Sequence, residues 1–269
     1  MADRLPLATL VGEGWDDYGL VDSGGGRKLE RYGPYRFIRP EPQAMWQPAL
    51  AESEWDAADG EFIPASDEDG GGRWYFHRPV PAEGWPLAWR EARFTASCTP
   101  FRHLGFFPDM APVWDWLRAQ IADKPDPAFL NLFGYTGVGS QALAAVGASV
   151  THVDASKKSV AQARENAALA KLDDKPVRWI VDDAGKFAAR EVRRERRYDA
   201  ILLDPPKFGR GPNNERWQLE EGVPPLLADC RRLLDADSRA LFLTVYAVRM
   251  SALAIGELLA QLFADLPGK

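Results

Sequence analysis

The chain has 269 residues, of which 46% are hydrophobic, so it can bury the core of one large domain and of a smaller second one. It has no run of about eighteen uncharged apolar residues and no apolar signal-peptide core at its start, which excludes a membrane span and predicts a cytoplasmic protein. The net charge of −6 excludes a global attraction to nucleic acid, although the arginine-rich runs over 27–39 and 193–197 could form local RNA-binding patches or plain solvated faces.

Cysteine and histidine usage predicts neither a disulfide framework nor a metal site. Cys98 and Cys230 lie far apart in the sequence without a CxxC spacing, and the three histidines are scattered. We therefore expect no metal and two buried, unpaired thiols. The sequence indicates no oligomeric state.

Residues 1–93 are rich in strand and turn signals, including SGGG at 23–26 and GGGR at 70–73, and predict a small β-rich N-terminal domain. Its tryptophans are expected to fill a small core rather than to stack on bases. Residues 94–127 form a connector with a helix over 111–121. Phe106 and Phe107, in the loop before that helix, would either cover a ligand or pack between domains.

The stretch over 128–154 reads as a strand, a glycine loop, a helix and a second strand. The apolar run over 129–133 has the length of a buried strand, a helix follows over 140–146, and the second strand ends at Asp154. Three glycines are expected to let the backbone turn tightly under a ligand: Gly134, Gly137 and Gly139. Asp154 lies twenty residues after the first glycine, where a carboxylate can accept both ribose hydroxyls.

The spacing of these glycines favours one nucleoside cofactor over another. A dinucleotide site needs glycines at the first, third and sixth positions of the loop, but here they occupy the first, fourth and sixth. S-adenosylmethionine has no pyrophosphate and needs only a close backbone approach and an acid for its ribose. We therefore predict S-adenosyl-L-methionine as the cofactor.

Two later strand ends add polar groups to the same edge of the predicted sheet. After a helix over 156–172, the strand over 177–184 ends in two acids, of which Asp183 is preferred for the adenine amino group because it leads directly into Ala184 and the next helix. The strand over 198–203 runs into the sequence DPPK at 204–207. Two consecutive prolines fix an extended backbone, which suits a rigid rim for a flat substrate.

The remaining chain predicts a mobile substrate loop over 209–217, a helix over 224–234, a fifth strand over 239–245 and a last helix over 251–262. The fold class is thus α/β, with a doubly wound, Rossmann-like sheet over 128–269 and a small N-terminal β-rich domain.

The motifs at 130–140, 153–154 and 203–212 together resemble class I S-adenosylmethionine-dependent methyltransferases, and among them the group of 23S rRNA cytosine-C5 enzymes. The resemblance covers residues 100–250, whereas residues 1–93 do not resemble the RNA-binding PUA module of those enzymes. Asn131 departs from the acid often found at the start of the loop. The resemblance implies a methyltransferase that modifies RNA, with rRNA among the expected acceptors; the alternatives are a methyltransferase of protein or small molecules and a non-catalytic S-adenosylmethionine-binding module.

The resemblance also implies roles for individual residues. The ribose would contact Asp154 and Ala155, and the adenine would contact Asp183 and Ala184. The methionine part would be held by the glycine loop, through Phe133, Gly134, Thr136, Gly137 and Gly139. The substrate edge would carry the catalytic residues Asp204, Pro205 and Lys207.

Two departures from the resembled group qualify the expected activity. Its fold adds a sixth and a seventh strand after the last helix, so either the sheet is short here or the chain is truncated. Its catalytic cysteine follows the fifth strand, where this chain has Ala247. Because carbon methylation needs that thiolate, we predict a nitrogen or oxygen acceptor, or a lost activity.

Overall fold

The structure is a computed structural model that describes residues 9–12, 14–65, 71–246 and 250–266. The chain divides into two compact units, an N-terminal unit over Gly12–Ala111 and a C-terminal unit that comprises residues 112–269 and the described residues 9–11. The two units are described separately below.

The N-terminal unit is built on a five-stranded sheet in the order β1-β2-β3-β4-β5, antiparallel except for the parallel pair β3 and β4. Its strands are β1 (Tyr18–Gly24), β2 (Arg27–Tyr32), β3 (Tyr35–Pro40), β4 (Gly60–Pro64) and β5 (Gly72–Phe76). The short helix α1 (Glu52–Asp56) precedes β4, and a separate hairpin pairs β6 (Trp85–Trp89) with β7 (Ala92–Ala96).

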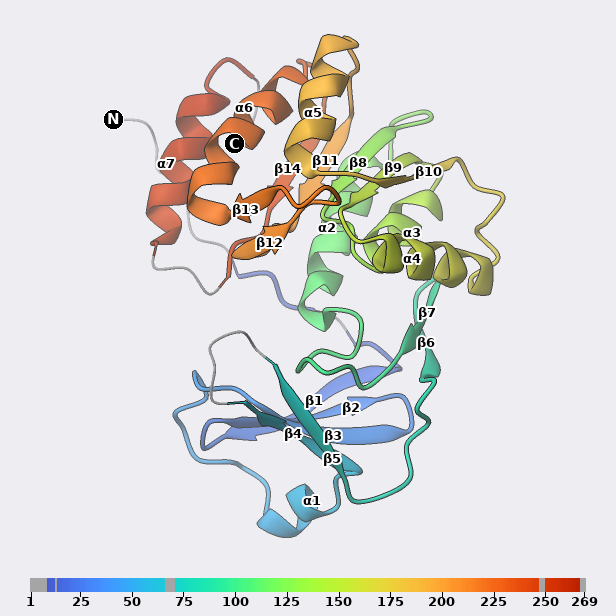
Figure 1. The fold of residues 1–269 in the computed structure, drawn as a ribbon, viewed down its shortest axis with the longest axis vertical. Coiled ribbons are helices and arrows are strands. Elements are labelled where there is room, and N and C mark those ends of the chain that lie inside the picture. The colour runs from blue at the N-terminus through green and yellow to red at the C-terminus, as the bar shows by residue number, and fades with distance from the viewer. Residues whose placement is uncertain (1–8, 13, 66–70, 247–249, 267–269) are drawn as a thin grey trace. The chain divides into compact units, whose positions relative to one another are not determined.

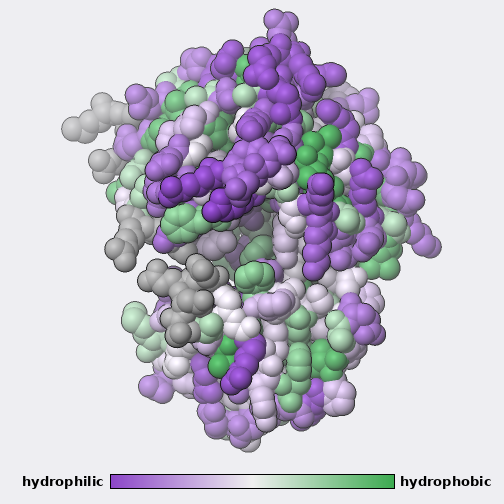
Figure 2. Space-filling view, in the orientation of Figure 1, coloured by the Kyte–Doolittle hydropathy of each residue, from purple (hydrophilic) through white to green (hydrophobic). Residues whose placement is uncertain are grey.

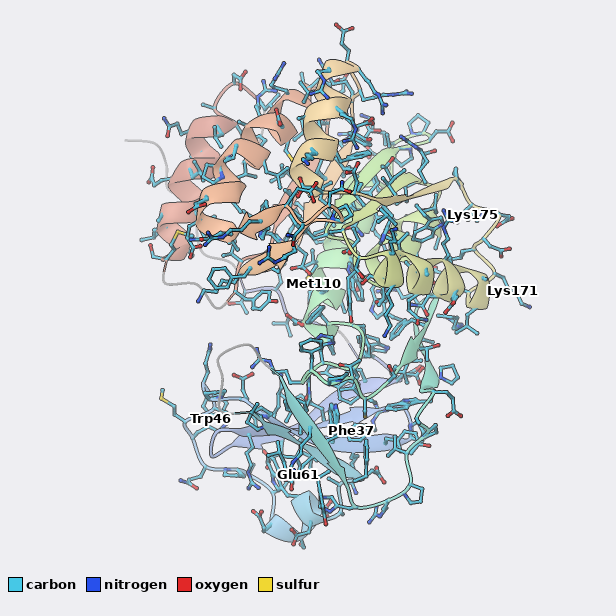
Figure 3. All side chains as sticks on the ribbon, in the orientation of Figure 1. Phe37, Trp46, Glu61, Met110, Lys171 and Lys175 are labelled. Carbon is cyan, nitrogen blue, oxygen red and sulfur yellow. The ribbon has the colours of Figure 1, made fainter. Side chains whose placement is uncertain are left out.

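Aromatic side chains fill the core of this unit. Trp55, Trp85 and Phe37 are buried, whereas Trp46 is 57% exposed, at the edge of the unit in Figure 3. Phe106 is buried within the same unit, where its ring lies against those of Trp15, Tyr32 and Phe94. Phe106 is therefore a core residue of the N-terminal unit.

The C-terminal unit contains a five-stranded parallel sheet in the order β10-β9-β8-β11-β14. The strands are β8 (Ala128–Leu132), β9 (Ser149–Asp154), β10 (Val177–Val181), β11 (Ala200–Leu203) and β14 (Ala240–Leu243). The strand order reverses between β8 and β11, and open α/β sheets bind ligands beside the carboxyl ends of the strands at such a point.

Helices cover both faces of this sheet (Figure 1). One face carries α2 (Ala111–Ile121), α3 (Val138–Ala144) and α4 (Lys157–Leu169). The other carries α5 (Ala184–Arg193), α6 (Leu219–Arg232) and α7 (Ala252–Leu262), which pack on an apolar cluster that includes Leu132, Leu203 and Leu227. A short 3₁₀ turn, η1 (Pro108–Met110), leads into α2.

The helices predicted over 140–146 and 156–172 occupy 138–144 and 157–169, and two further segments differ in kind or in start. The stretch expected to be a mobile loop over 209–217 is a hairpin of β12 (Phe208–Arg210) and β13 (Arg216–Gln218). The helix expected to begin at Pro224 begins five residues earlier, at Leu219. Burial of Leu219 and Val223, and a hydrogen bond from the Leu219 amide to the Lys207 carbonyl (3.0 Å), fix this earlier start despite the two prolines inside the helix.

Within the described part of the chain, no helix is long and apolar enough to cross a membrane. No group of three or more metal-ligating side chains is found there either.

Candidate active site

Backbone hydrogen bonds hold the carboxyl ends of the five strands together. The Gly134 amide donates to the Val153 carbonyl (3.0 Å) and the Asp182 amide to the Asp154 carbonyl (3.0 Å). On the other side of β8, the Thr244 amide donates to the Leu203 carbonyl (2.9 Å). The loops that follow the strands therefore lie side by side at one edge of the sheet.

The loop turns tightly, with a hydrogen bond from the Gly137 amide to the Gly134 carbonyl (3.0 Å), and its three glycines have different surroundings. Only Gly137 has a left-handed backbone, with φ +80°, as the N-cap of α3. A Cβ on Gly134 would lie 2.5 Å from the His152 ring, and one on Gly139 would lie 2.9 Å from Nε1 of Trp114. Gly134 and Gly139 are thus needed for close packing.

The left-handed conformations that remain in the loop belong to two residues with large side chains, Phe133 (φ +59°) and Tyr135 (φ +49°). Such residues cost about 1 kcal/mol or more each and persist only where the surroundings enforce them. Here Asn166 of α4 donates its amide to the Thr136 carbonyl (2.9 Å), which ties the loop to the neighbouring helix. The loop is therefore a rigid, preformed element.

A buried polar chain lies beneath the loop. The Asn131 amide donates to the Ser140 hydroxyl (2.9 Å), and that hydroxyl is 2.9 Å from Nδ1 of His152. The other ring nitrogen of His152, Nε2, is buried without a hydrogen-bond partner among the described residues. Burial lowers the pKa of His152 to about 3. Asn131 thus serves the packing under the loop.

Asp154 ends β9 with a half-buried carboxylate. One carboxylate oxygen accepts from the Tyr135 amide (2.9 Å) and the other from the Ser156 amide (2.8 Å). Burial raises the pKa of Asp154, and the two amides oppose that rise. Each oxygen has a second lone pair left, so the carboxylate can still accept two ligand hydroxyls, which fits the ribose of S-adenosylmethionine.

The two acids after β10 differ in the partners of their carboxylates. Asp182 pairs with the guanidinium of Arg190. Asp183 caps α5, and only one of its oxygens accepts from the Lys186 amide (2.9 Å). Asp183 is half-buried and followed by the buried Ala184.

The sequence DPPK forms the other wall of the site. Asp204 accepts a hydrogen bond from the Thr244 hydroxyl, and Pro205 is buried. The Pro206 carbonyl accepts from Nε1 of Trp217 (2.7 Å). The Lys207 ammonium lies 5.3 Å from the centre of the Phe208 ring, which is 59% exposed.

Trp217 was not predicted as a site residue, although it connects the two walls. Its ring centre lies 4.8 Å from that of Phe133 in the glycine loop, while its indole N–H holds the Pro206 carbonyl. An ion pair between Lys186 of α5 and Glu215 (2.6 Å) also ties the β12–β13 hairpin down. The only sequence signal for Trp217 as a site residue was that it is a single aromatic residue in the polar run GPNNERW. Figure 2 shows the hairpin as a hydrophilic band.

Residues 48–229, more than half of the chain, match the family of S-adenosylmethionine-dependent methyltransferases. The ribosomal RNA large subunit methyltransferase K/L of Hahella chejuensis is 33% identical over 144 residues, which are 53% of this chain and 19% of that protein. The ribosomal RNA large subunit methyltransferase I of Alteromonas mediterranea is 36% identical over 105 residues, which are 39% of this chain and 26% of that protein. The matches thus span about a fifth to a quarter of the length of these curated relatives.

Solved structures extend the similarity to both units. A SAM-dependent methyltransferase from Agrobacterium tumefaciens is 47% identical, with a TM-score of 0.88 over 93% of this chain and 79% of that one. A methyltransferase from Streptococcus mutans shares the fold at 18% identity, with a TM-score of 0.72 over 94% of this chain and 67% of that one. The expected α/β fold, enzyme class and cofactor are confirmed. The chain belongs to the family of S-adenosylmethionine-dependent methyltransferases.

Proposed function

We propose that this methyltransferase modifies RNA, with ribosomal RNA as the first candidate, and that the accepting atom is a nitrogen or an oxygen. The relatives named as ribosomal RNA methyltransferases support the acceptor class. The observation that supports a nitrogen or oxygen acceptor is that burial raises the pKa of both thiols.

Neither thiol is suited to attack a pyrimidine ring. Cys230, on α6, is fully buried in the apolar cluster, and burial raises the pKa of its thiol. Cys98 belongs to the N-terminal unit, and burial raises its pKa to about 12. Position 247, where the sequence has alanine, lies outside the described residues. A thiolate adduct on the ring is therefore not part of the proposed reaction.

We propose the following roles at the site. Asp154, with Ala155 beside it, holds the ribose; Asp183 and Ala184 hold the adenine; and the glycine loop from Phe133 to Gly139 approaches the methionine part. When bound, S-adenosylmethionine supplies the electrophilic methyl group. The chain aligns the acceptor in line with the methyl–sulfur bond and excludes water.

On the acceptor side, Asp204 and the Pro205 carbonyl accept hydrogen bonds from the attacking group, and Lys207 binds a phosphate or a base carbonyl. The rigid proline pair, held through Trp217, suits a flat base. The Thr244 hydroxyl fixes the orientation of the Asp204 carboxylate.

The test is transfer of a tritiated methyl group from S-adenosylmethionine to three separate fractions: ribosomal RNA, protein and small metabolites. We expect label in RNA, and nucleoside analysis of the digest should find a methylated nitrogen or oxygen. Label found only in protein or only in metabolites would show that the acceptor belongs to that class and not to RNA. A 5-methylpyrimidine product, or a denaturation-resistant complex with 5-fluorocytosine RNA that Cys230→Ser abolishes, would overturn the proposed atom. Binding of S-adenosylhomocysteine without transfer to any fraction would indicate a non-catalytic module.

Lys207 provides a sharper test of the acceptor side. We expect Lys207→Ala to leave the affinity for S-adenosylhomocysteine within about threefold, because the residue lies beyond the proline pair. Its kcat/KM for RNA should fall by about 10- to 100-fold, which corresponds to one lost charged hydrogen bond. Lys171→Ala, on the exposed connection after α4, is the matched control and should change neither quantity. Loss of S-adenosylhomocysteine binding in Lys207→Ala would move the residue to the cofactor side.

A further inference from the structure

The C-terminal end of α5 carries a dense group of exposed arginines. Residues 193–197 are all exposed, and four of these five residues are arginines. Arg178, on the edge strand β10, is 51% exposed and reaches the same place. The group is defined here as the arginine patch: Arg178, Arg193, Arg194, Arg196 and Arg197. It underlies part of the hydrophilic surface at the top of Figure 2, where α5 ends in Figure 1.

A single buried acid draws two of these arginines together. Glu191 is 1% exposed, and its carboxylate pairs with Arg194 (2.9 Å) and lies 3.8 Å from Arg178. Its second oxygen also accepts from the Tyr198 hydroxyl (2.8 Å). Two guanidinium groups thus share one negative charge, which leaves a net positive charge at the surface.

The other three arginines of the patch have no carboxylate partner within the described residues. Arg197 donates only to the backbone carbonyl of Arg196 (3.0 Å), and no side-chain partner is found for Arg193 or Arg196. By contrast, Arg27, Arg36 and Arg78 of the N-terminal unit each pair with an acid. A charged face that serves only solubility usually balances both signs, whereas here the five arginines surround a single exposed acid, Glu195.

The helix end explains part of this arrangement. The Glu195 amide donates to the Val192 carbonyl (3.0 Å) and the Arg196 amide to the Glu191 carbonyl (3.1 Å), which closes the helix with a Schellman motif. Cations in the last turn of a helix are favoured by its dipole, which accounts for Arg193 and Arg194. Arg196 and Arg197 lie beyond the helix, so the dipole does not account for them.

The place of the patch limits what it can bind. α5 begins after Asp183 at the active-site edge and ends at the opposite edge of the sheet, about 15 Å away at 1.5 Å per residue. A small acceptor in the active site cannot span that distance. A polyanion that extends along the unit can, and its regularly spaced phosphates suit the planar, bidentate guanidinium groups.

We infer that the arginine patch is a second RNA contact, which binds phosphates of the acceptor strand away from the methylation site. This inference rests on the proposed function, because it takes RNA as the acceptor. The patch adds affinity and salt dependence without sequence readout.

The test compares two triple variants of the full chain. The patch variant is Arg193→Gln, Arg196→Gln and Arg197→Gln. The control is Arg164→Gln, Lys171→Gln and Lys175→Gln, which removes the same charge from exposed positions on and after α4, where Asp173 and Asp174 neutralise part of the charge. Affinity for a labelled 30-nucleotide single-stranded RNA is measured by anisotropy between 50 and 200 mM salt. Binding of S-adenosylhomocysteine verifies the fold of both variants.

We expect the patch variant to lower the slope of log affinity against log salt by about two, at roughly 0.7 per lost phosphate contact, and the control to leave the slope unchanged. Its KM for ribosomal RNA should rise at least tenfold while kcat at saturating RNA is retained. Equal behaviour of the two variants would overturn the inference while leaving RNA as the acceptor. Failure of the wild type to bind or methylate RNA would reject the proposed function. A loss of binding to phosphatidylglycerol vesicles alone would assign the patch to a membrane surface.

Discussion

Among single residues, Asp154 has a carboxylate that the neighbouring backbone holds in place. Its distance from the glycine loop and its place at the end of a strand predicted a ribose contact. The structure adds that both carboxylate oxygens already accept one backbone amide each, from Tyr135 and Ser156. The carboxylate is thus oriented before any ligand binds, which spacing alone could not predict.

Asp154→Ala should weaken S-adenosylhomocysteine binding by about 30- to 1000-fold, or roughly 2 to 4 kcal/mol, because two charged hydrogen bonds are lost. Isothermal titration calorimetry measures the change. Asp182→Asn is the matched control and should stay within about threefold, since that carboxylate pairs with Arg190. Equal affinities of the wild type and Asp154→Ala would remove Asp154 from the ribose site.

His152 predicts a pH dependence of stability. Its folded pKa of about 3 lies below the ordinary value of 6.5, so the unfolded chain binds a proton that the folded chain does not. Stability is therefore intact above pH 6.5 and is lost as the pH falls toward 3. Between pH 7 and pH 5 we expect a loss of about 2 kcal/mol from this residue.

Urea unfolding at pH 7 and pH 5 measures this loss in the wild type and in two variants. His152→Gln should unfold more easily at pH 7 but lose this part of the pH dependence, whereas His77→Gln, at an exposed histidine, should retain it. The same pH dependence in all three proteins would mean that His152 is protonated in the folded state.

Among the elements, the sequence predicted the five strands of the parallel sheet and its helices, because buried runs and apolar periodicity mark them. The helix ends at Ile121 and Leu262 were predicted, whereas the helix predicted to end at Leu172 ends at Leu169. Gly147 closes α3 with a Schellman motif, and α4 and α5 end in the same motif with Lys171 (φ +56°) and Glu195 (φ +55°) at the left-handed position. These two ends carry no glycine, so the sequence does not mark them.

Glycine at these two positions should stabilise the fold. Lys171→Gly and Glu195→Gly relieve a left-handed backbone, and we expect each to raise the free energy of unfolding by about 0.5 to 1 kcal/mol. Glu165→Gly, inside α4 and exposed, is the opposite control and should cost about 1 kcal/mol. Chemical denaturation measures whether each substitution raises or lowers the free energy of unfolding. Destabilisation by Glu195→Gly would show that the Glu195 side chain contributes more stability than the left-handed backbone costs.

The hairpin of β12 and β13 was missed for a different reason. Its strands have three residues each, and its polar sequence lacks the alternation that marks a strand. Burial of Trp217 against Phe133 and the ion pair of Glu215 with Lys186 stabilise it. Such contacts join residues far apart in the sequence, so local patterns do not reveal them.

For the whole molecule, the net charge is a poor guide to partners, because the two units differ. Residues 12–111 hold 17 acidic and 10 basic side chains, whereas residues 112–269 hold 21 acidic and 22 basic ones. The negative charge of the chain thus belongs to the N-terminal unit, and the methyltransferase sheet is close to neutral. The negative net charge of the chain therefore does not oppose RNA binding by the C-terminal unit.

Hydrogen exchange over the whole chain should locate the bound cofactor. At a concentration 100-fold above its Kd, S-adenosylhomocysteine adds about 2.7 kcal/mol to the free energy of every opening that abolishes its site. We expect slower exchange over 133–137, 154–156 and 182–185, and no change over the arginine patch at 193–197. Mass spectrometry of peptides provides the measurement, and protection restricted to other segments would reject the assignment of the site.

Gly134 and His152 occupy one shared space, and this makes their substitutions epistatic. Because a Cβ at position 134 would meet the imidazole, the glycine there is set by the volume of its neighbour rather than by its own backbone. A side chain at 134 is tolerated only when position 152 becomes smaller, so the double substitution should cost less than the sum of the two single ones. Covariation of these two positions among related sequences would therefore report a packing constraint beneath the cofactor loop, although a motif search would count Gly134 as a ligand contact.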